Sequence, residues 1–183
     1  GPVEDPTRLV GQLLDEDVAL PRWEQQNIVF LLFCAYCCKA MLAVTFGDAE
    51  TALAAAERGR GYLYGAAGTV YFTEHNLYWS LALLAVAAER TAEEATPMLN
   101  QVAKNQAQRA IWSARAPANF ELGYQLIEAE RAALSGDVLV AMKRYQDAIL
   151  AARERHNARL EALICERAAG LYHRLGHRLV GDG

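Results

Sequence analysis

Apolar residues along this chain recur every three to four positions, and the strict alternation expected of β-strands is almost absent. That spacing places apolar side chains on one face of a helix. Residues with high helix propensity, chiefly Ala, Leu, Glu and Arg, dominate the composition. The sequence therefore predicts an all-α fold of about seven to eight helices, arranged as stacked antiparallel hairpins.

Proline, glycine and capping residues set the predicted helix boundaries. Gly47 ends a long helix and Asp48 caps the next one, whereas Pro117 interrupts the chain. Thr91 or Thr96 caps the fifth helix, with a proline in its first turn. The predicted helices cover residues 6–14, 23–45, 48–63, 70–89, 91 or 96 to 115, 118–134, 137–156 and 159–175, with connections at 15–21 and 65–68 and the start of a ninth helix after residue 176.

A spaced set of small residues occurs twice, 89 positions apart. Small residues let two helices approach closely, and a glycine allows the turn between them. A third, shorter copy ends at Gly176, and its distance from Gly136 exceeds the ideal length of a tetratricopeptide repeat, which is about 34 residues. The arrangement therefore resembles that repeat in a degenerate form, which implies hairpins stacked as a right-handed superhelix. The copies consist of Ala40, Ala43, Gly47, Asp48, Ala52, Ala56 and Gly59, then Ala129, Ala132, Gly136, Asp137, Ala141, Tyr145 and Ala148, then Ala169, Tyr172 and Gly176.

Several sequence strings, in order, resemble one family of large bacterial and fungal signalling proteins. They are FGDAETALAAAERGRGYL at residues 46–63, EHNLYWSLALLA at 74–85, ANF at 118–120, EAERAALSGD at 128–137 and YQDAI at 145–149. In that family a serine/threonine-kinase-like domain and an AAA or STAND-type ATPase precede tetratricopeptide-like repeats, and often a GAF domain and a sensor histidine kinase follow. The resemblance covers most of residues 25–177 and implies the helical-repeat region of such a protein. The chain departs from the family in its cysteine-rich second helix, and none of the kinase or ATPase motifs lies in it.

Composition and charge restrict the function classes. The chain has 183 residues, of which 53% are hydrophobic, and a net charge of −4. An acidic chain gives no support for nucleic-acid binding. Gly1 and Pro2 are expected to remain from removal of a purification tag, so residues 3–183 are expected to form a single helical-repeat domain. The polar, acidic start lacks a signal-peptide pattern, which predicts a cytoplasmic protein.

Residues 28–46 form an apolar stretch long enough to be considered as a membrane span. Lys39 is its one charged residue, and a lysine near the centre of a span costs about 2.5–3.5 kcal/mol. Gly47, Asp48 and an alanine-rich segment follow directly. We therefore expect a buried central helix and no membrane partner, because a helix that is apolar all round is normal inside a helical protein.

Two groups of polar and aromatic residues are the candidate ligand- or partner-binding sites. Aromatic rings offer contact area, and His or Asn side chains offer directed hydrogen bonds. The alternative is that both groups are interhelical core, the second acting as a hydrophobic hinge between repeats. The first group consists of Tyr36, Tyr71, His75, Asn76, Tyr78 and Trp79, and the second of Trp112, Asn119, Phe120 and Tyr124.

Cys34, Cys37 and Cys38 share one helix face, since they lie at positions i, i+3 and i+4. They suit a soft metal or an oxidation sensor, or they serve as small apolar core residues. A structural zinc needs four ligands, and no second CxxC or HxxxH pattern completes a set, so we expect no metal and no cofactor. The glycine-rich residues 59–69 have no lysine before Thr69, and no serine lies in a GxSxG motif, so we expect no catalysis.

These features predict a non-catalytic regulatory module. The leading hypothesis is a repeat scaffold that relays signals within a larger kinase or ATPase, by binding another domain, a protein partner or a second copy in a homodimer. The alternative is a sensor domain of the same kind of signalling protein, in which an aromatic-lined pocket holds a small molecule.

Overall fold

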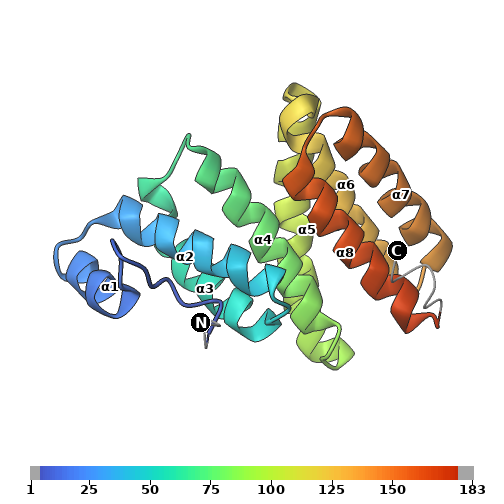
Figure 1. Ribbon diagram of the computed structural model, residues 1–183. Helices are drawn as coiled ribbons and strands as arrows, with labels where there is room; N and C mark the ends of the chain where they lie inside the picture. The colour runs from blue at the N-terminus through green and yellow to red at the C-terminus, as the bar shows by residue number, and fades with distance from the viewer. Residues whose placement is uncertain (1–4, 177–183) are drawn as a thin grey trace. The chain divides into compact units, whose positions relative to one another are not determined.

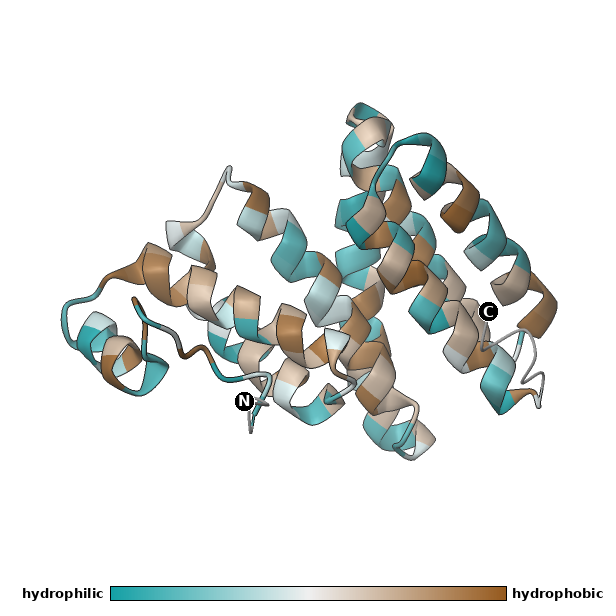
Figure 2. Cartoon of the chain, in the orientation of Figure 1, coloured by the Kyte–Doolittle hydropathy of each residue, from teal (hydrophilic) through white to brown (hydrophobic). Residues whose placement is uncertain are grey.

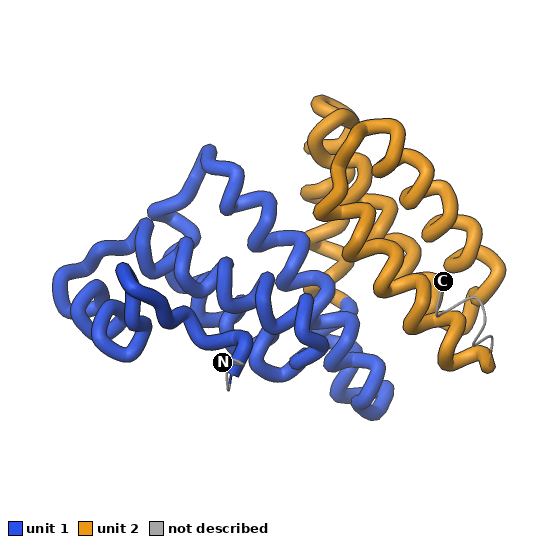
Figure 3. Tube along the Cα trace, in the orientation of Figure 1, with its two compact units in different colours: residues 1–99 blue, residues 100–183 orange. Residues whose placement is uncertain are grey.

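The computed structural model describes residues 5–176, and this part of the chain folds into eight α-helices and one short 3₁₀-helix (Figure 1). The predicted all-α class and number of helices are confirmed. The chain divides into two compact units, unit 1 (residues 1–99) and unit 2 (residues 100–183) (Figure 3). The elements are α1 (Glu16–Gln25), α2 (Val29–Thr45), α3 (Ala49–Arg60), η1 (Leu63–Gly65), α4 (Val70–Ala87), α5 (Ala92–Arg115), α6 (Pro117–Leu134), α7 (Val138–Glu154) and α8 (Ala158–Arg174).

Unit 1 is organised around helix α2, which packs against α3 and α4. Helix α2 is apolar along most of its length (Figure 2). Leu32, Phe33 and Ala40 of this helix are almost completely buried, so the apolar stretch seen in the sequence is a core helix. Across the described residues, none of the helices has the length and apolar character needed to cross a membrane.

Unit 2 contains the second part of α5 and the three helices α6, α7 and α8, which pack on one another. Helix α6 packs against both α7 and α8, and α7 packs against α8. Leu126 and Ile127 of α6, Tyr145 of α7 and Ile164 of α8 are almost completely buried and form its core. The arrangement consists of two successive helical hairpins that share α7.

One kind of turn recurs at the ends of helices in both units. In four of these turns a residue adopts a positive φ between 52° and 85°, namely Asn27, Gly47, Gly136 and His156. The amide of the following residue then donates to the carbonyl five residues earlier, at 2.9 Å in all four turns. This Schellman-type pattern satisfies carbonyls at the helix end and leads the chain directly into the next helix.

The turn residues recur at a constant interval within each unit. Positions 27 and 47 of unit 1 are 20 residues apart, as are positions 136 and 156, and 156 and 176, of unit 2, where Gly176 has a φ of 77°. Gly68 of unit 1, with a φ of 82°, follows the 3₁₀-helix and lies outside this series. Each step from one position of the series to the next contains one helix and one turn, and two steps make a hairpin. This explains why the interval between Gly136 and Gly176 in the sequence is longer than a tetratricopeptide repeat.

The repeated small residues lie where helices touch, as their spacing predicts. In unit 1, Ala40 of α2 and Ala52 of α3 are 0% exposed, and these two helices pack on each other. In unit 2, Ala129 of α6 and Ala141 of α7 occupy the corresponding places and are also 0% exposed. A small side chain at each position lets the two helix backbones come close together.

The N-terminal part of unit 1 differs from the prediction. Residues 6–14, predicted as a helix, form turns and an isolated bridge between Val10 and Asp15. The predicted connection at residues 15–21 is instead the beginning of α1. The Asp15 side chain caps this helix by accepting a hydrogen bond from the Asp17 amide at 3.0 Å, which stabilises its first turn.

The predicted long helix over residues 23–45 is interrupted. Asn27 has a φ of 52°, which ends α1, and α2 begins two residues later. Asparagine tolerates this left-handed conformation better than most residues, so no glycine is needed there. Without a glycine or proline, the sequence pattern did not reveal the break.

Other boundaries follow the predicted pattern with local changes. Thr91, not Thr96, caps α5: the Glu94 side chain accepts from the Thr91 amide at 3.0 Å, and the Glu94 amide donates to the Thr91 hydroxyl at 3.4 Å. Pro97 consequently lies in the second turn of α5 instead of the first. Pro117 is the first residue of α6, where its missing amide hydrogen costs nothing. The ninth helix predicted after residue 176 falls outside the described residues.

Candidate functional site

His75 lies at the centre of the first aromatic group. It is 2% exposed, and its Nε2 lies 2.8 Å from the Ala56 carbonyl of α3, to which it donates a hydrogen bond. Its ring lies against those of Phe33 and Trp79, with centroids 5.3 and 5.6 Å apart. Burial lowers the pKa of His75 and so favours the neutral imidazole, whereas the hydrogen bond to Ala56 acts in the opposite direction.

Gly59 of α3 allows this close approach between helices. A Cβ at this position would lie 3.2 Å from Cδ2 of His75 and 3.3 Å from Cβ of Tyr36. Both distances are tighter than ordinary van der Waals contact, so a side chain at Gly59 would push α3 away from α2 and α4. The glycine of the repeated small-residue set therefore brings His75 and Tyr36 to the same part of unit 1.

Trp79 also belongs to this interior, although its polar edge reaches charged side chains. It is 5% exposed, and its indole N–H donates to the Glu57 carboxylate at 3.0 Å. The Arg60 guanidinium lies 5.7 Å from the centroid of its ring. Tyr78 is 2% exposed and Asn76 is half-buried. Trp79 therefore joins α4 to α3.

Tyr36 contacts a different set of partners, on the side of α2 that faces α1. Its hydroxyl donates to the Glu24 carboxylate at 3.3 Å, and its ring stacks on Tyr62 with centroids 6.0 Å apart. The Arg58 guanidinium lies 5.4 Å from the Tyr36 ring centroid. Burial raises the pKa of Tyr36, so its hydroxyl stays protonated and donates.

Tyr71 lies apart from these contacts and is 38% exposed. Its ring meets that of Phe30 edge to face, with centroids 6.3 Å apart, and Phe30 is 41% exposed. Its backbone carbonyl accepts a weak hydrogen bond from the Cys37 thiol at 3.8 Å. Phe30 and Tyr71 form an exposed aromatic pair at the first turns of α2 and α4, which we call the aromatic edge.

The second aromatic group is only partly brought together. Trp112 of α5 and Phe120 of α6 are in contact, with ring centroids 6.0 Å apart, and both are half-buried. Asn119 is exposed in the first turn of α6. Tyr124 is half-buried, and its backbone carbonyl accepts from the Gln106 side chain at 3.1 Å. The Trp112–Phe120 contact spans the Pro117 junction between α5 and α6.

Buried polar residues of α5 form hydrogen bonds with half-buried polar residues of α6 in unit 2, and the sequence did not reveal these contacts. Gln106 is 4% exposed and also donates to the Glu128 carboxylate at 3.0 Å. Ser113 donates to Glu121, whose carboxylate also accepts from Gln125 at 2.6 Å. These hydrogen bonds hold the pKa of Glu121 below its usual value. Polar residues at helical spacing usually face solvent, which is why the pattern carried no signal.

A second polar cluster in unit 2 surrounds Tyr145, which is 1% exposed. Burial, followed by the charge of Glu130, raises the pKa of Tyr145. The Arg167 Nε lies 3.4 Å from the Glu130 carboxylate. These three side chains come from α7, α6 and α8, so they join the three helices of the unit.

The cysteines lie in helices and carry free thiols. Cys37 is buried, and burial raises the pKa of the Cys34 and Cys38 thiols. A raised pKa disfavours the thiolate, which is the form that binds metals and is oxidised most readily. In residues 5–176, no group of three or more His, Cys, Asp or Glu side chains is placed to hold a metal ion.

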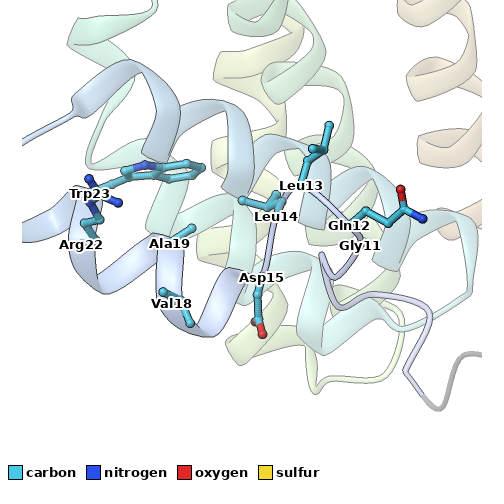
Figure 4. A pocket seen from close by; sticks show the side chains of 9 residues that line it. All are labelled: Gly11, Gln12, Leu13, Leu14, Asp15, Val18, Ala19, Arg22 and Trp23. Atoms are coloured by element: carbon cyan, nitrogen blue, oxygen red, sulfur yellow. The ribbon is translucent and has the colours of Figure 1, made fainter.

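One pocket lies at the N-terminal end of unit 1, away from the predicted site residues. It has a volume of about 430 Å³ and is formed by residues 11–15 and the adjacent side of α1 (Figure 4). Apolar side chains of Leu14, Val18 and Trp23 line it, together with the polar Asp15 and Arg22. Its size falls within the range of small-molecule sites.

Comparison of the chain with protein-family models, with curated proteins and with solved structures gave no match. The functional argument therefore depends on the geometry of the chain itself.

Proposed function

We propose that this chain is a non-catalytic helical-repeat module that binds a protein segment and relays signals between domains of a larger signalling protein. The observation that carries this proposal is the regular succession of a helix and a Schellman-type turn, with such turns at positions 27 and 47 of unit 1 and at positions 136 and 156 of unit 2. Such repeats bury one face of each helix on its neighbours and leave the other face for a partner. The family resemblance supplies the kinase or ATPase context.

The aromatic edge is the first surface to test for partner binding. Phe30 and Tyr71 are each about two-fifths exposed and already contact one another. Aromatic side chains are enriched where proteins bind each other, because they bury large areas at a small entropic cost. A flanking domain of the same polypeptide is the proposed partner.

The test is isothermal titration calorimetry between this chain and the polypeptides encoded immediately before and after it. We expect one of them to bind, and we expect Phe30→Lys to weaken that binding at least tenfold. Leu139→Lys is the matched control, since Leu139 is 82% exposed on α7 of unit 2 and should leave the affinity unchanged. Absence of binding to either flanking polypeptide would refute the relay function.

A small-molecule sensor is the second proposal. It is supported by the approach of His75 and Tyr36 to Gly59 and by the contact of the His75 ring with Trp79. A ligand that enters between them would raise the melting temperature of the chain. Loss of that shift in Trp79→Ala, in a protein that still melts cooperatively, would favour the sensor over the relay module.

A further inference from the structure

Helix α1 makes its buried contact with the rest of unit 1 through a carboxylate. Glu16 is the buried residue of this helix. It forms an ion pair with Lys39 of α2, and both side chains are largely buried. The other carboxylate oxygen accepts from the Leu9 amide at 2.8 Å. An acidic group therefore holds the beginning of α1 and the segment before it.

A second carboxylate holds the other end of α1. The Glu24 Oε1 accepts from the hydroxyls of Tyr36 and Tyr62, at 3.3 and 3.4 Å. It also accepts from the Arg58 guanidinium at 3.3 Å. The groups that donate to α1 thus come from α2, from α3 and from the residue before η1. We call this set of side chains the donor face, which consists of Tyr36, Lys39, Arg58 and Tyr62.

Most of the donor face is organised by contacts that do not involve α1. The rings of Tyr36 and Tyr62 are stacked, with 4° between their planes, and Arg58 lies over Tyr36. Tyr36 is also fixed against Gly59, where a Cβ would lie 3.3 Å from its own. Because these contacts do not depend on α1, we expect them to keep the donors arranged without it, and a preorganised set of donors lowers the cost of binding another carboxylate.

Apart from these two carboxylates, few interactions stabilise helix α1 in its position. It has ten residues, a length at which isolated helices are marginal in water. Pro21 lies inside it and removes one backbone hydrogen bond. Val18 is 67% exposed, and the side chains of Val18, Ala19 and Trp23 line a pocket instead of a packed core (Figure 4). The attachment therefore depends strongly on its two acidic groups.

We propose that the donor face is a docking site for an acidic helix of a partner protein, and that α1 occupies this site as an internal substitute. The partner helix carries two carboxylates at the same spacing as Glu16 and Glu24, positions i and i+8. At 1.5 Å per residue this spacing is about 12 Å along the helix axis. Binding of the partner displaces α1 and the segment that Glu16 holds.

The donor face requires an acidic occupant because of Lys39. This lysine lies within the apolar helix α2, and its side chain is 16% exposed. Removing Glu16 without replacement would leave a largely buried cation without its counter-charge, which is unfavourable. A partner that supplies a carboxylate at this place restores the ion pair, whereas an apolar or basic partner does not. The inference rests on the proposed function only in taking a protein segment as the ligand.

The probe is a fluorescein-labelled peptide with the sequence of residues 15–26, titrated into the full chain and followed by fluorescence anisotropy. In the variant Glu16→Gln/Glu24→Gln, α1 no longer competes, and we expect the peptide to bind at least tenfold more tightly than to the unchanged chain. Adding Lys39→Met and Arg58→Met to that variant should abolish binding. The control Glu89→Gln/Glu93→Gln removes two exposed acidic groups elsewhere in unit 1, and it should bind the peptide with the same affinity as the unchanged chain.

A second peptide, with Gln in place of both Glu residues, should fail to bind any of these chains. Equal binding of the acidic peptide to the unchanged chain and to Glu16→Gln/Glu24→Gln, or equal binding of both peptides, would overturn the inference. Thermal melting of each variant shows whether it is folded, and Glu16→Gln alone replaces the double variant if that one is not. If the acidic peptide does not bind as expected but a flanking domain still binds the chain, this inference alone is refuted. If the peptide binds as expected but no flanking domain binds, the relay function alone is refuted.

Discussion

Among single residues, Gly59 allows close packing in the interior of unit 1 because it lacks a side chain. The place where its Cβ would be lies within 3.3 Å of His75 and Tyr36. The glycine lowers the intrinsic stability of α3, since glycine is a poor helix former. The packing of α2, α3 and α4 that it permits is the compensating gain.

Gly59→Ala is expected to destabilise the protein by about 1–2 kcal/mol. Overpacking of a filled interior costs about 1–3 kcal/mol, and the higher helix propensity of alanine returns part of this. Gly170→Ala in α8 is the matched control, because its Cβ would meet only the end of the Arg174 side chain at 3.6 Å. That variant should be more stable by about 0.5–1 kcal/mol. Urea unfolding measures both, and a Gly59→Ala variant as stable as Gly170→Ala would contradict the packing argument.

His75 makes the stability of unit 1 dependent on pH. Its buried side chain has a lowered pKa, whereas in the unfolded chain it titrates near its ordinary value of about 6.5. Burial lowers the pKa most, the hydrogen bond to Ala56 and the charge of Glu57 raise it, and the charge of Arg60 lowers it further. Below about pH 6.5 the unfolded state therefore binds more protons than the folded state.

The free energy of unfolding should consequently decrease as the pH falls from about 6.5 towards the folded-state pKa of His75. Above about pH 6.5, the stabilisation that depends on neutral His75 is fully present. His75→Gln should flatten this part of the pH profile. His173→Gln, an exposed histidine of α8, should retain it. Thermal melting between pH 4.5 and 8 checks the prediction, and parallel profiles for the unchanged chain and His75→Gln would contradict it.

Among the elements, a helix followed by its turn is the structural unit that repeats. The hydrogen bond across the turn has the same length at Gly136 and at His156, although only one of them is a glycine. A left-handed φ is unfavourable for a side chain with a Cβ. The His156 turn, between α7 and α8, therefore stores strain that the Gly136 turn does not.

Exchanging the residue types at these two turns should change stability in opposite directions. We expect His156→Gly to stabilise the protein by about 0.5–1 kcal/mol and Gly136→Ala to destabilise it by at least about 1 kcal/mol. Both residues are exposed, so packing does not obscure the comparison. Urea unfolding of the two variants is the measurement. A His156→Gly variant that is less stable would show that the histidine side chain has a role beyond its backbone conformation.

In the molecule as a whole, charge is divided unevenly between the units. Residues 1–99 hold 13 acidic and 6 basic side chains, whereas residues 100–183 hold 9 acidic and 12 basic ones. In the acidic unit 1, two of the six basic side chains belong to the donor face and contact α1. An acidic partner is therefore attracted to that place by local contacts and not by the net charge of the unit.

The mass of the intact molecule distinguishes the two proposed functions. A relay module purified without its partner should show the mass of its sequence alone, 20.1 kDa, in native mass spectrometry. A sensor with a tightly held ligand should show an excess that disappears under denaturing conditions. The same spectrum shows whether the chain is a monomer or a homodimer. A reproducible mass excess would count against the relay module.

The helical class, the glycine turns and the buried small residues could all be predicted from the amino-acid sequence, because they depend on steric and hydrogen-bonding rules among near neighbours in the chain. Gly47 and Gly136 are examples, since both end a helix with the positive φ that glycine readily adopts. Of the residues in the two aromatic groups, the rings of His75 and Trp79 and those of Trp112 and Phe120 lie in contact. The division of the first group into buried His75 and Trp79, and exposed Tyr71, was not predictable from spacing.

The pairing of residues that are distant in the sequence could be learned only from the folded structure. Lys39 is the one charge in the apolar helix α2, and only the folded structure shows that it forms an ion pair with Glu16 of α1. The position of α1 likewise depends on Glu24 meeting side chains from two other helices. Such contacts are set by the packing of whole helices, in which the burial of apolar faces brings together polar groups that no local pattern connects.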